Sequence, residues 1–207
     1  MIFMPILFSF DLRAQQYYSI GKDTLTSPNY SWFISADFEK TINSEINYNS
    51  VGFSTSFLIR NIGFIGLYAS GMVSSLKYLD FNHTVYSFSD FNLNFSHGGL
   101  YLGIKPKIYN RINTLFSLKI GRGAVFLYEN GNTYNYSFGR DKVWVFTPML
   151  ESQIRLLSWV KLNLSTGVRF IEGISSHFYN NEQKIKLYQS SYFDGIVIGL
   201  SIRFCKN

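Results

Sequence analysis

Apolar and polar side chains alternate along most of the chain after residue 29. Between Ile196 and Phe204, for example, every second residue is apolar, and most positions between them carry glycine, serine or arginine. A period of two is typical of a β-strand whose two faces meet different surroundings. In one such run the alternation is lost at Gly121–Gly123, which we interpret as a β-bulge. The runs predict eight strands, at about residues 30–39, 51–60, 63–78, 99–108, 116–121, 143–155, 160–170 and 195–204.

The connections between these strands alternate in length. An even-stranded meander with short turns at one end and long loops at the other is typical of outer-membrane barrels. The sequence therefore predicts an all-β fold, an eight-stranded antiparallel up-and-down transmembrane β-barrel over residues 28–205, with both termini on the short-turn, periplasmic side. Long connections are expected at about residues 41–49, 79–96, 129–142 and 173–192, and short ones at 61–62, 109–113 and 156–159.

The chemistry of the two strand faces indicates which one points outward. The face opposite the apolar one carries mostly Gly, Ser, Thr and Asn, which suits a narrow interior better than the surface of a soluble barrel. Aromatic residues near strand ends suit two interfacial girdles. A secreted soluble lipid-binding barrel has the same meander and remains an alternative. The aromatic residues in question are Tyr30, Trp32, Trp144, Trp159, Phe170 and Phe204.

Four ionisable residues share the small, polar face and are therefore expected inside the barrel: Lys119, Glu151, Arg169 and Arg203. Lys119 and Glu151 are predicted to lie at similar depth on adjacent strands, where cross-strand side chains meet. An unpaired charge in a filled interior is costly, so we expect a salt bridge between them, joined by Arg169 or Arg203. The predicted role of this ion-pair network is structural.

Composition narrows the class of protein further. Of 207 residues, 46% are hydrophobic and 15% charged, which excludes a disordered chain. No run of about 18 apolar residues is present, so a membrane-spanning helix is excluded. A single cysteine, Cys205, excludes an internal disulfide and a Cys-based metal site. The net charge of +6 is not gathered into one run, and no nucleic-acid partner is expected.

The first residues have the pattern of a targeting segment. An apolar run, Ile2–Phe10, is followed by a short polar piece that ends near Ala14 and Gln15. This pattern resembles a secretory signal peptide, and we expect residues 1–15 to be removed on export. The alternative is a buried first strand.

The C-terminal half resembles a known group of barrels. Residues Val143–Phe170, with the Pro148 to Glu151 spacing, and the closing strand to Phe204 are similar to the small outer-membrane barrels of OmpX/OmpA-like type common in Bacteroidota, mostly of unassigned function. The resemblance implies localisation in the outer membrane of a Gram-negative bacterium. The pattern Gly199-x-x-Ile202-x-Phe204 also resembles the signal that barrel-assembly machinery reads. Thr147 stands where an acidic residue is expected in that family, so no role is carried over to it.

Few residues offer catalytic or binding chemistry. Glu172, Ser175, Ser176 and His177 have the composition of a hydrolytic site, which leaves a lipid-A-modifying enzyme as an alternative. Neighbours on an extended chain point to opposite faces, however, so we expect no catalytic residue and no enzyme. No cofactor or metal site is expected, since His83, Asp80 and Asp90 lie in a loop rich in ordinary polar residues. Lys184 and Lys186 are candidates for contact with lipopolysaccharide phosphates.

These points lead to a functional expectation. An eight-stranded barrel is just wide enough to be filled by its own side chains, so a general diffusion pore is not expected. Activity must then lie in the loops and the outer surface. The strands around residues 74–78 and 91–96 are predicted to protrude from the membrane and to bind a surface protein partner by strand addition. The expected function is that of a non-enzymatic outer-membrane protein that binds partners or joins an envelope complex.

Overall fold

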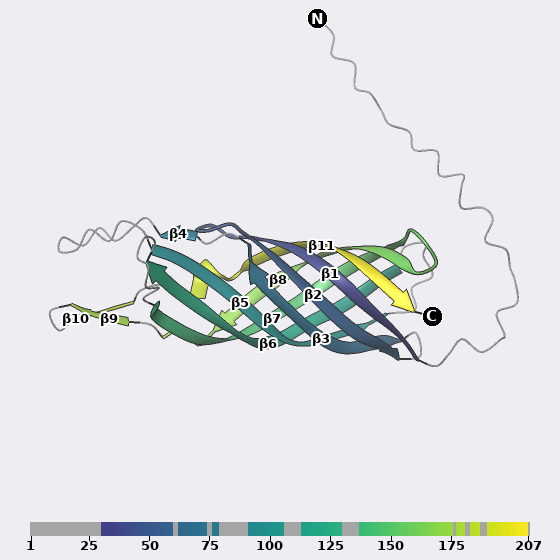
Figure 1. The fold of residues 1–207 in the computed structure, drawn as a ribbon, viewed down its shortest axis with the longest axis horizontal. Helices are drawn as coiled ribbons and strands as arrows, with labels where there is room; N and C mark the ends of the chain where they lie inside the picture. Colours follow the sequence, from purple (N-terminus) through teal and green to yellow (C-terminus); the bar gives the residue numbers. More distant parts are fainter. Residues whose placement is uncertain are drawn as a thin grey trace, which may run out of the picture.

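The computed structural model describes residues 30–59, 62–73, 76–78, 91–105, 113–129, 137–175, 177–180, 183–186 and 190–206. Eight antiparallel strands form a closed barrel, because each strand pairs with the next one along the chain and β1, the first, pairs with β11, the last (Figure 1). The predicted fold class is confirmed. The strands of the barrel are β1 (Tyr30–Ile42), β2 (Tyr48–Ile59), β3 (Gly63–Met72), β5 (Phe91–Ile104), β6 (Asn113–Glu129), β7 (Ser137–Arg155), β8 (Val160–Glu172) and β11 (Gly195–Lys206).

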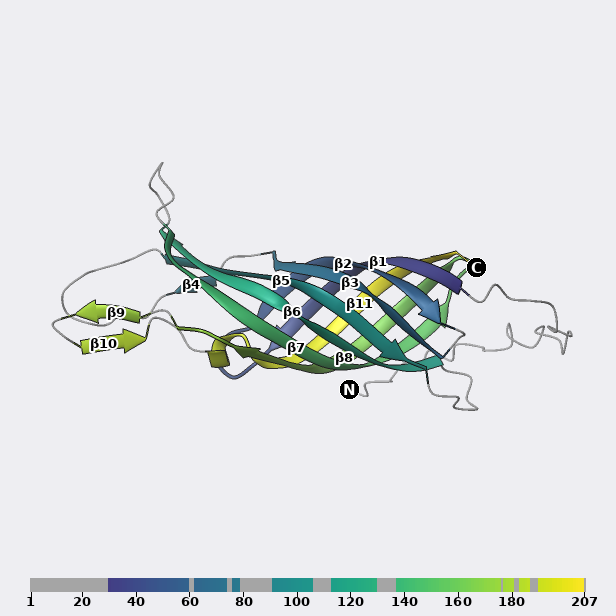
Figure 2. The same cartoon turned by 90° about the horizontal axis from the view of Figure 1, so that it is seen from below.

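Smaller elements lie at one end of this barrel. A short strand, β4 (Leu76–Tyr78), pairs with the first residues of β5. A separate hairpin of β9 (His177–Asn180) and β10 (Gln183–Lys186) extends beyond the barrel wall (Figure 2). The 3₁₀-helix η2 (Ser190–Tyr192) precedes β11. We call this end the long-loop end and the opposite one the short-turn end.

Both chain ends of the barrel lie at the short-turn end. Tyr30 pairs with Ile59, and Lys206 pairs with Trp32, so β1 begins where β11 ends (Figure 1). At the long-loop end, the connection of residues 43–47 is shorter than the sequence indicated. The reason is that β1 and β2 continue to pair out to Thr41 and Tyr48.

Strand length differs around the barrel. Strands β6 and β7 have 17 and 19 residues, well above the roughly 9–11 needed to span a bilayer. The hairpin that the sequence indicated is also extended, because β4 pairs with the first residues of the 14-residue β5 beyond the end of β3 at Met72, but the following hairpin of β6 and β7 is longer. The bulge expected at Gly121–Gly123 is wrong: pairing with both neighbours is continuous there, and a register shift occurs at Leu127/Tyr128 instead.

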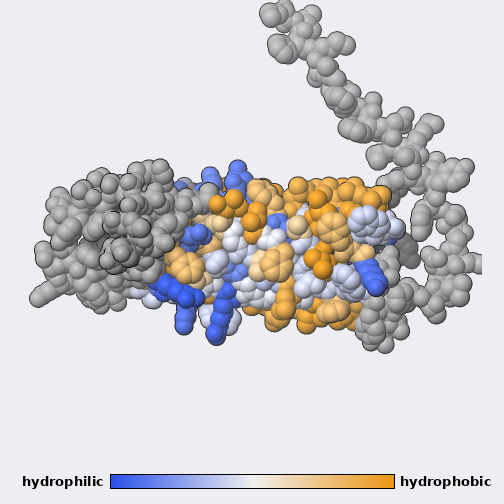
Figure 3. Space-filling model, in the orientation of Figure 1, coloured by the Kyte–Doolittle hydropathy of each residue, from blue (hydrophilic) through white to orange (hydrophobic). Residues whose placement is uncertain are grey.

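The outer wall is apolar. Large hydrophobic side chains on it, such as Phe57, Leu67 and Ile198, are between 36% and 62% exposed, which is the reverse of a soluble protein. On the face shown in Figure 3, hydrophobic residues predominate over the short-turn half and middle of the barrel, and hydrophilic side chains lie toward the long-loop end. Within the described ranges, no helix is long and apolar enough to cross a membrane.

The interior, or lumen, is filled by side chains in layers. One apolar cluster lies toward the long-loop end and the other toward the short-turn end, and buried polar residues connect them. The first cluster comprises Tyr48, Leu93, Phe95, Val125, Val143, Val145, Ile171 and Phe193. The second comprises Phe33, Phe64, Tyr68, Tyr101, Leu115, Met149 and Cys205.

Candidate functional site

Glu39 on β1 is the centre of the first ionic group in the lumen. Its two carboxylate oxygens accept from Lys119 Nζ and from an Arg169 terminal nitrogen, each at 2.5 Å. Lys119 Nζ also lies 3.6 Å from an Asp37 oxygen. Each of these side chains points inward because it occupies the polar parity of its strand. One carboxylate thus pairs with two cations, one from β6 on the opposite side of the barrel and one from β8, which is separated from β1 only by β11.

This group also joins the two apolar clusters. Arg169 donates to the hydroxyl of Tyr48, which belongs to the long-loop cluster, at 3.2 Å. Lys119 Nζ lies 5.4 Å from the ring centres of Tyr68 and Tyr101, which belong to the short-turn cluster. The charges are therefore held by hydrogen bonds and aromatic faces as well as by each other.

Glu151 on β7 is the centre of the second ionic group. Its carboxylate accepts from an Arg203 terminal nitrogen at 2.6 Å, from Asn163 Nδ2 at 3.0 Å, and from the hydroxyls of Tyr101 and Ser117. The Arg203 guanidinium lies over the Phe33 ring at 4.7 Å. Four donors around one buried carboxylate compensate for the water that it lost.

All four residues expected in the lumen lie there and take part in ion pairs, but one expected pairing is wrong. Lys119 faces Thr147 across the strands, whereas Glu151 faces Leu115, so the lysine and the glutamate lie at different depths. Lys119 pairs with Glu39, which sequence reasoning missed. The signal was present, because Glu39 occupies the polar parity of the first strand.

The long-loop end of the lumen is closed by the segment before β11. Phe193 is completely buried, packs against Phe95 with ring centres 5.2 Å apart, and its carbonyl accepts from the Tyr48 hydroxyl at 3.0 Å. Asn43 holds this segment in place: its Nδ2 donates to the carbonyls of Ser191, Tyr192 and Asp194, at 2.6, 3.0 and 2.8 Å. This segment therefore closes the lumen at the long-loop end, and we call it the plug.

Asp194 supplies a second anchor for the same segment. Its carboxylate accepts from the backbone N–H of Ile171, at the end of β8, at 2.6 Å. Burial raises the pKa of Asp194, and the nearby charge of Glu172 acts in the same direction against the effect of that hydrogen bond.

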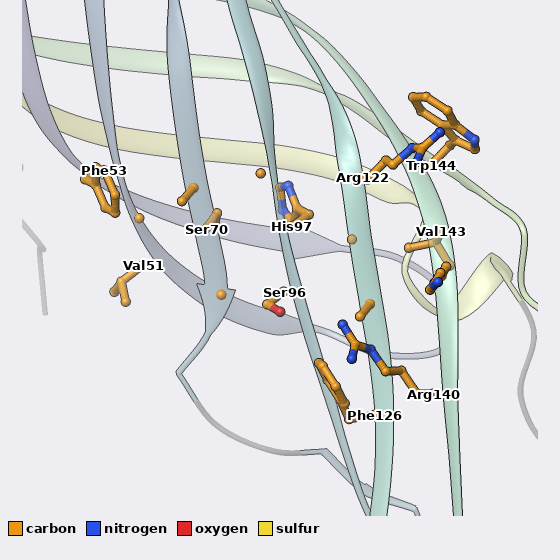
Figure 4. A pocket seen from close by; sticks show the side chains of 17 residues that line it. Val51, Phe53, Ser70, Ser96, His97, Arg122, Phe126, Arg140, Val143 and Trp144 are labelled. Carbon is orange, nitrogen blue, oxygen red and sulfur yellow. The ribbon is translucent and has the colours of Figure 1, made fainter. Parts of the chain in front are cut away.

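A groove of about 1100 Å³ crosses the outer wall over β2, β3, β5, β6 and β7. Small residues on β3 and β5, among them Gly71, Ser96 and Gly98, leave it hollow. Val51 and Phe53 form one side of the groove (Figure 4). At this groove, the outward side chains of neighbouring strands are too small to complete the apolar surface of the wall.

The other side of the groove carries three cations, Arg122, Arg140 and Lys142. The Arg122 guanidinium lies 4.5 Å from the centre of the Trp144 ring, and that of Arg140 lies 5.4 Å from the Phe126 ring (Figure 4). We call these three residues the cation trio. No carboxylate oxygen of the described residues lies within 4.0 Å of their side-chain nitrogens.

The other sequence candidates are placed as follows. His97 lies inside the lumen, where its Nδ1 is 3.2 Å from the Tyr68 hydroxyl. Ser175 donates to Asp141 at 3.1 Å. Cys205 is a free, buried thiol. Outside the described residues lie residues 1–15, which are expected to form a signal peptide, Asp80, His83, Asp90 and Ser176, and the side chains of His177, Lys184 and Lys186. In the described part of the chain, no three His, Cys, Asp or Glu side chains gather as a metal site.

Comparison with solved structures places the fold. The chain is similar to Neisserial surface protein A (NspA), with 9% sequence identity, 87% of this chain and 99% of that chain covered, and a TM-score of 0.51. It is also similar to Ail, the attachment invasion locus protein of Yersinia pestis, in complex with the heparin analogue sucrose octasulfate, with 9% identity, 86% and 97% covered, and a TM-score of 0.44. The sequence matches no protein-family model and no curated protein. The chain thus has the fold of a small eight-stranded outer-membrane barrel.

Proposed function

We propose that this chain is a non-enzymatic outer-membrane protein that binds partners with its outer surface and its long-loop end, and not a pore. The observation that carries the proposal is the inverted distribution of polarity. Apolar side chains are exposed on the wall, and ion pairs are buried in the lumen. Such a wall is stable in lipid, where an exposed apolar surface costs nothing.

The lumen supports the exclusion of a pore. Arg169, Arg203, Glu151 and Phe193 are all 1% exposed or less, so side chains occupy the cross-section at successive depths. Passage of a solute would require the ion pairs to separate and the Phe193 segment to leave. Binding must therefore take place outside the lumen.

In this proposal the chain is exported by a signal peptide at residues 1–15 and enters the membrane through barrel-assembly machinery that reads β11. Both termini lie in the periplasm, and the long-loop end faces the exterior. Strands β5, β6 and β7 continue beyond the apolar band at that end and offer a surface for a protein partner.

The test combines location and conductance. The full-length protein, expressed in a Gram-negative host, is expected in the outer-membrane fraction, with gel migration that changes on heating. Planar bilayers that contain the purified protein should show no steady ion conductance. Recovery in the soluble periplasmic fraction would refute the membrane assignment, and stable open channels would refute the filled lumen.

A further inference from the structure

The outer groove and the cation trio point to a lipid ligand. We propose that this groove binds one molecule of a phosphorylated, multiply acylated glycolipid, the chemistry of lipid A, with its phosphates on Arg122, Arg140 and Lys142. The proposal rests on the membrane location argued above and names a ligand for the outer wall.

The position of the trio fits a headgroup at the membrane surface. On the outward parity of β6, Arg122 directly follows Phe116, Leu118 and Ile120, so it is the first charge beyond the apolar band. On β7, Arg140 and Lys142 lie on the long-loop side of Trp144 and Phe146, which are outward and apolar. All three cations therefore lie where the bilayer interior gives way to headgroups.

The trio is also arranged in advance of binding. Arg122 pairs with Trp144 across β6 and β7, Ala124 with Lys142, and Phe126 with Arg140. Each arginine thus rests on the aromatic ring of the neighbouring strand, and the small Ala124 leaves room between them. Guanidinium groups fixed in this way lose little freedom when they bind phosphate oxygens, and their planar forks suit that geometry.

The positive charge of the trio indicates which class of ligand fits the groove. A ring face attracts a cation but does not neutralise it, and no carboxylate oxygen of the described residues lies within 4.0 Å of the trio, so three positive charges lie together on this part of the wall. A single phosphodiester brings about one negative charge, whereas a bisphosphorylated headgroup brings two or more and fits three cations better. The groove of about 1100 Å³ lies slightly above the roughly 300–1,000 Å³ typical of ligand pockets. This volume favours a lipid with several acyl chains.

The trio and the hollow can be tested separately. The charge variant is Arg122→Gln/Arg140→Gln/Lys142→Gln, and its control is Lys40→Gln, an exposed cation on β1 that does not line the groove. The filling variant is Gly71→Leu, because a Cβ at Gly71 meets only Ser96 Cβ, at an ordinary 3.7 Å. Its control is Thr166→Leu, an exposed position on β8 outside the groove.

Binding is measured by native mass spectrometry of the full chain in a non-ionic detergent. The probes are bisphosphorylated hexa-acyl lipid A, the same lipid without phosphates, phosphatidylglycerol and inorganic phosphate. Wild type and both controls should bind the bisphosphorylated lipid, and the charge variant and the filling variant should each bind it about tenfold more weakly or worse. Removal of both phosphates should weaken binding to a similar degree, and inorganic phosphate should not compete, since it has no acyl chains.

Several results would overturn the proposal. These are equal binding of the lipid without phosphates, equal binding of phosphatidylglycerol, or full binding by either variant. If the charge variant fails to show the gel shift of a folded barrel, Arg140→Gln alone replaces it and should still weaken binding. Failure here would leave the fractionation and conductance results untouched. A change in mass of the bound lipid A would instead refute the non-enzymatic function while leaving the groove assignment intact.

Discussion

Replacement of Glu39 by glutamine should be among the most damaging single changes in the lumen. Glu39 is the one carboxylate that contacts both Lys119 and Arg169, each at 2.5 Å. Glutamine keeps the shape of the side chain and removes its charge. Among the described residues, Lys119 would then keep one carboxylate, that of Asp37 at 3.6 Å, and Arg169 would have none, only the hydroxyls of Thr41, Tyr48 and Thr147 and the neutral amide oxygen of the new glutamine.

The magnitude follows from the burial of these groups. Arg169 is fully buried and Lys119 is 4% exposed, so water cannot replace the lost carboxylate. Loss of one partner from a buried ion pair typically costs about 3–5 kcal/mol in the free energy of unfolding. We expect Glu39→Gln to fall in this range, and the further change Lys119→Met to recover part of the loss by removing a cation without a partner.

The assay is reversible urea unfolding of the barrel in lipid vesicles, followed by tryptophan fluorescence. A double-mutant cycle should give strong coupling between Glu39 and Lys119 and little between Glu151 and Lys119. A loss below about 1 kcal/mol for Glu39→Gln would show that water reaches this depth. The argument for a closed lumen would then fail at that level.

Further changes test the second ionic group and the plug. Glu151→Leu should cost about 3–5 kcal/mol in the same unfolding assay, and Arg203→Met, but not Lys119→Met, should recover part of it. Phe193→Ala should cost about 3–5 kcal/mol and raise ion leakage in planar bilayers, and an unchanged leak would contradict its role as a plug. Because the raised pKa of Asp194 favours its protonated form in the folded state, its contribution is present at low pH and is lost as pH rises through that pKa. Wild type should therefore gain stability relative to Asp194→Asn on acidification, and a pH-independent difference would refute this.

The outward-facing residues of this barrel could largely be predicted from the sequence, because contact with lipid places one simple requirement on them. Each outward position in the membrane must be apolar, so alternation alone shows where strands lie and which parity faces out. That is why β8 and β11 could be outlined within a few residues. Other strands were outlined less well: β5 begins at Phe91 rather than near Gly99, and β6 runs on to Glu129. One cause was Gly121–Gly123, where the outward Arg122 broke the alternation and suggested a bulge. The strand is continuous there, and the arginine instead marks the end of the apolar band.

The partners of lumen charges could not be predicted in the same way. Parity places Lys119 and Glu151 inside but does not fix their depth, which depends on how the tilted strands are staggered around the barrel. Lys119 reaches across the lumen to Glu39, 80 residues away in sequence, rather than to the neighbouring strand. The plug was also missed, since Phe193 lies in a long connection with no periodic pattern to show that it folds inward.

The charged residues of the barrel form two groups: those in the lumen have a structural role, and those on the outer wall are proposed to bind a ligand. Among the described residues, the fully buried cations Lys119, Arg169 and Arg203 each have a carboxylate within 4.0 Å. The outward trio, by contrast, has no carboxylate oxygen of the described residues within 4.0 Å, and its two arginines lie against aromatic rings, which orient a charge without cancelling it. A barrel wall at a lipid boundary gains nothing in stability from three adjacent unneutralised cations. In the proposed complex, a negatively charged group from the surrounding membrane completes this arrangement and makes it favourable.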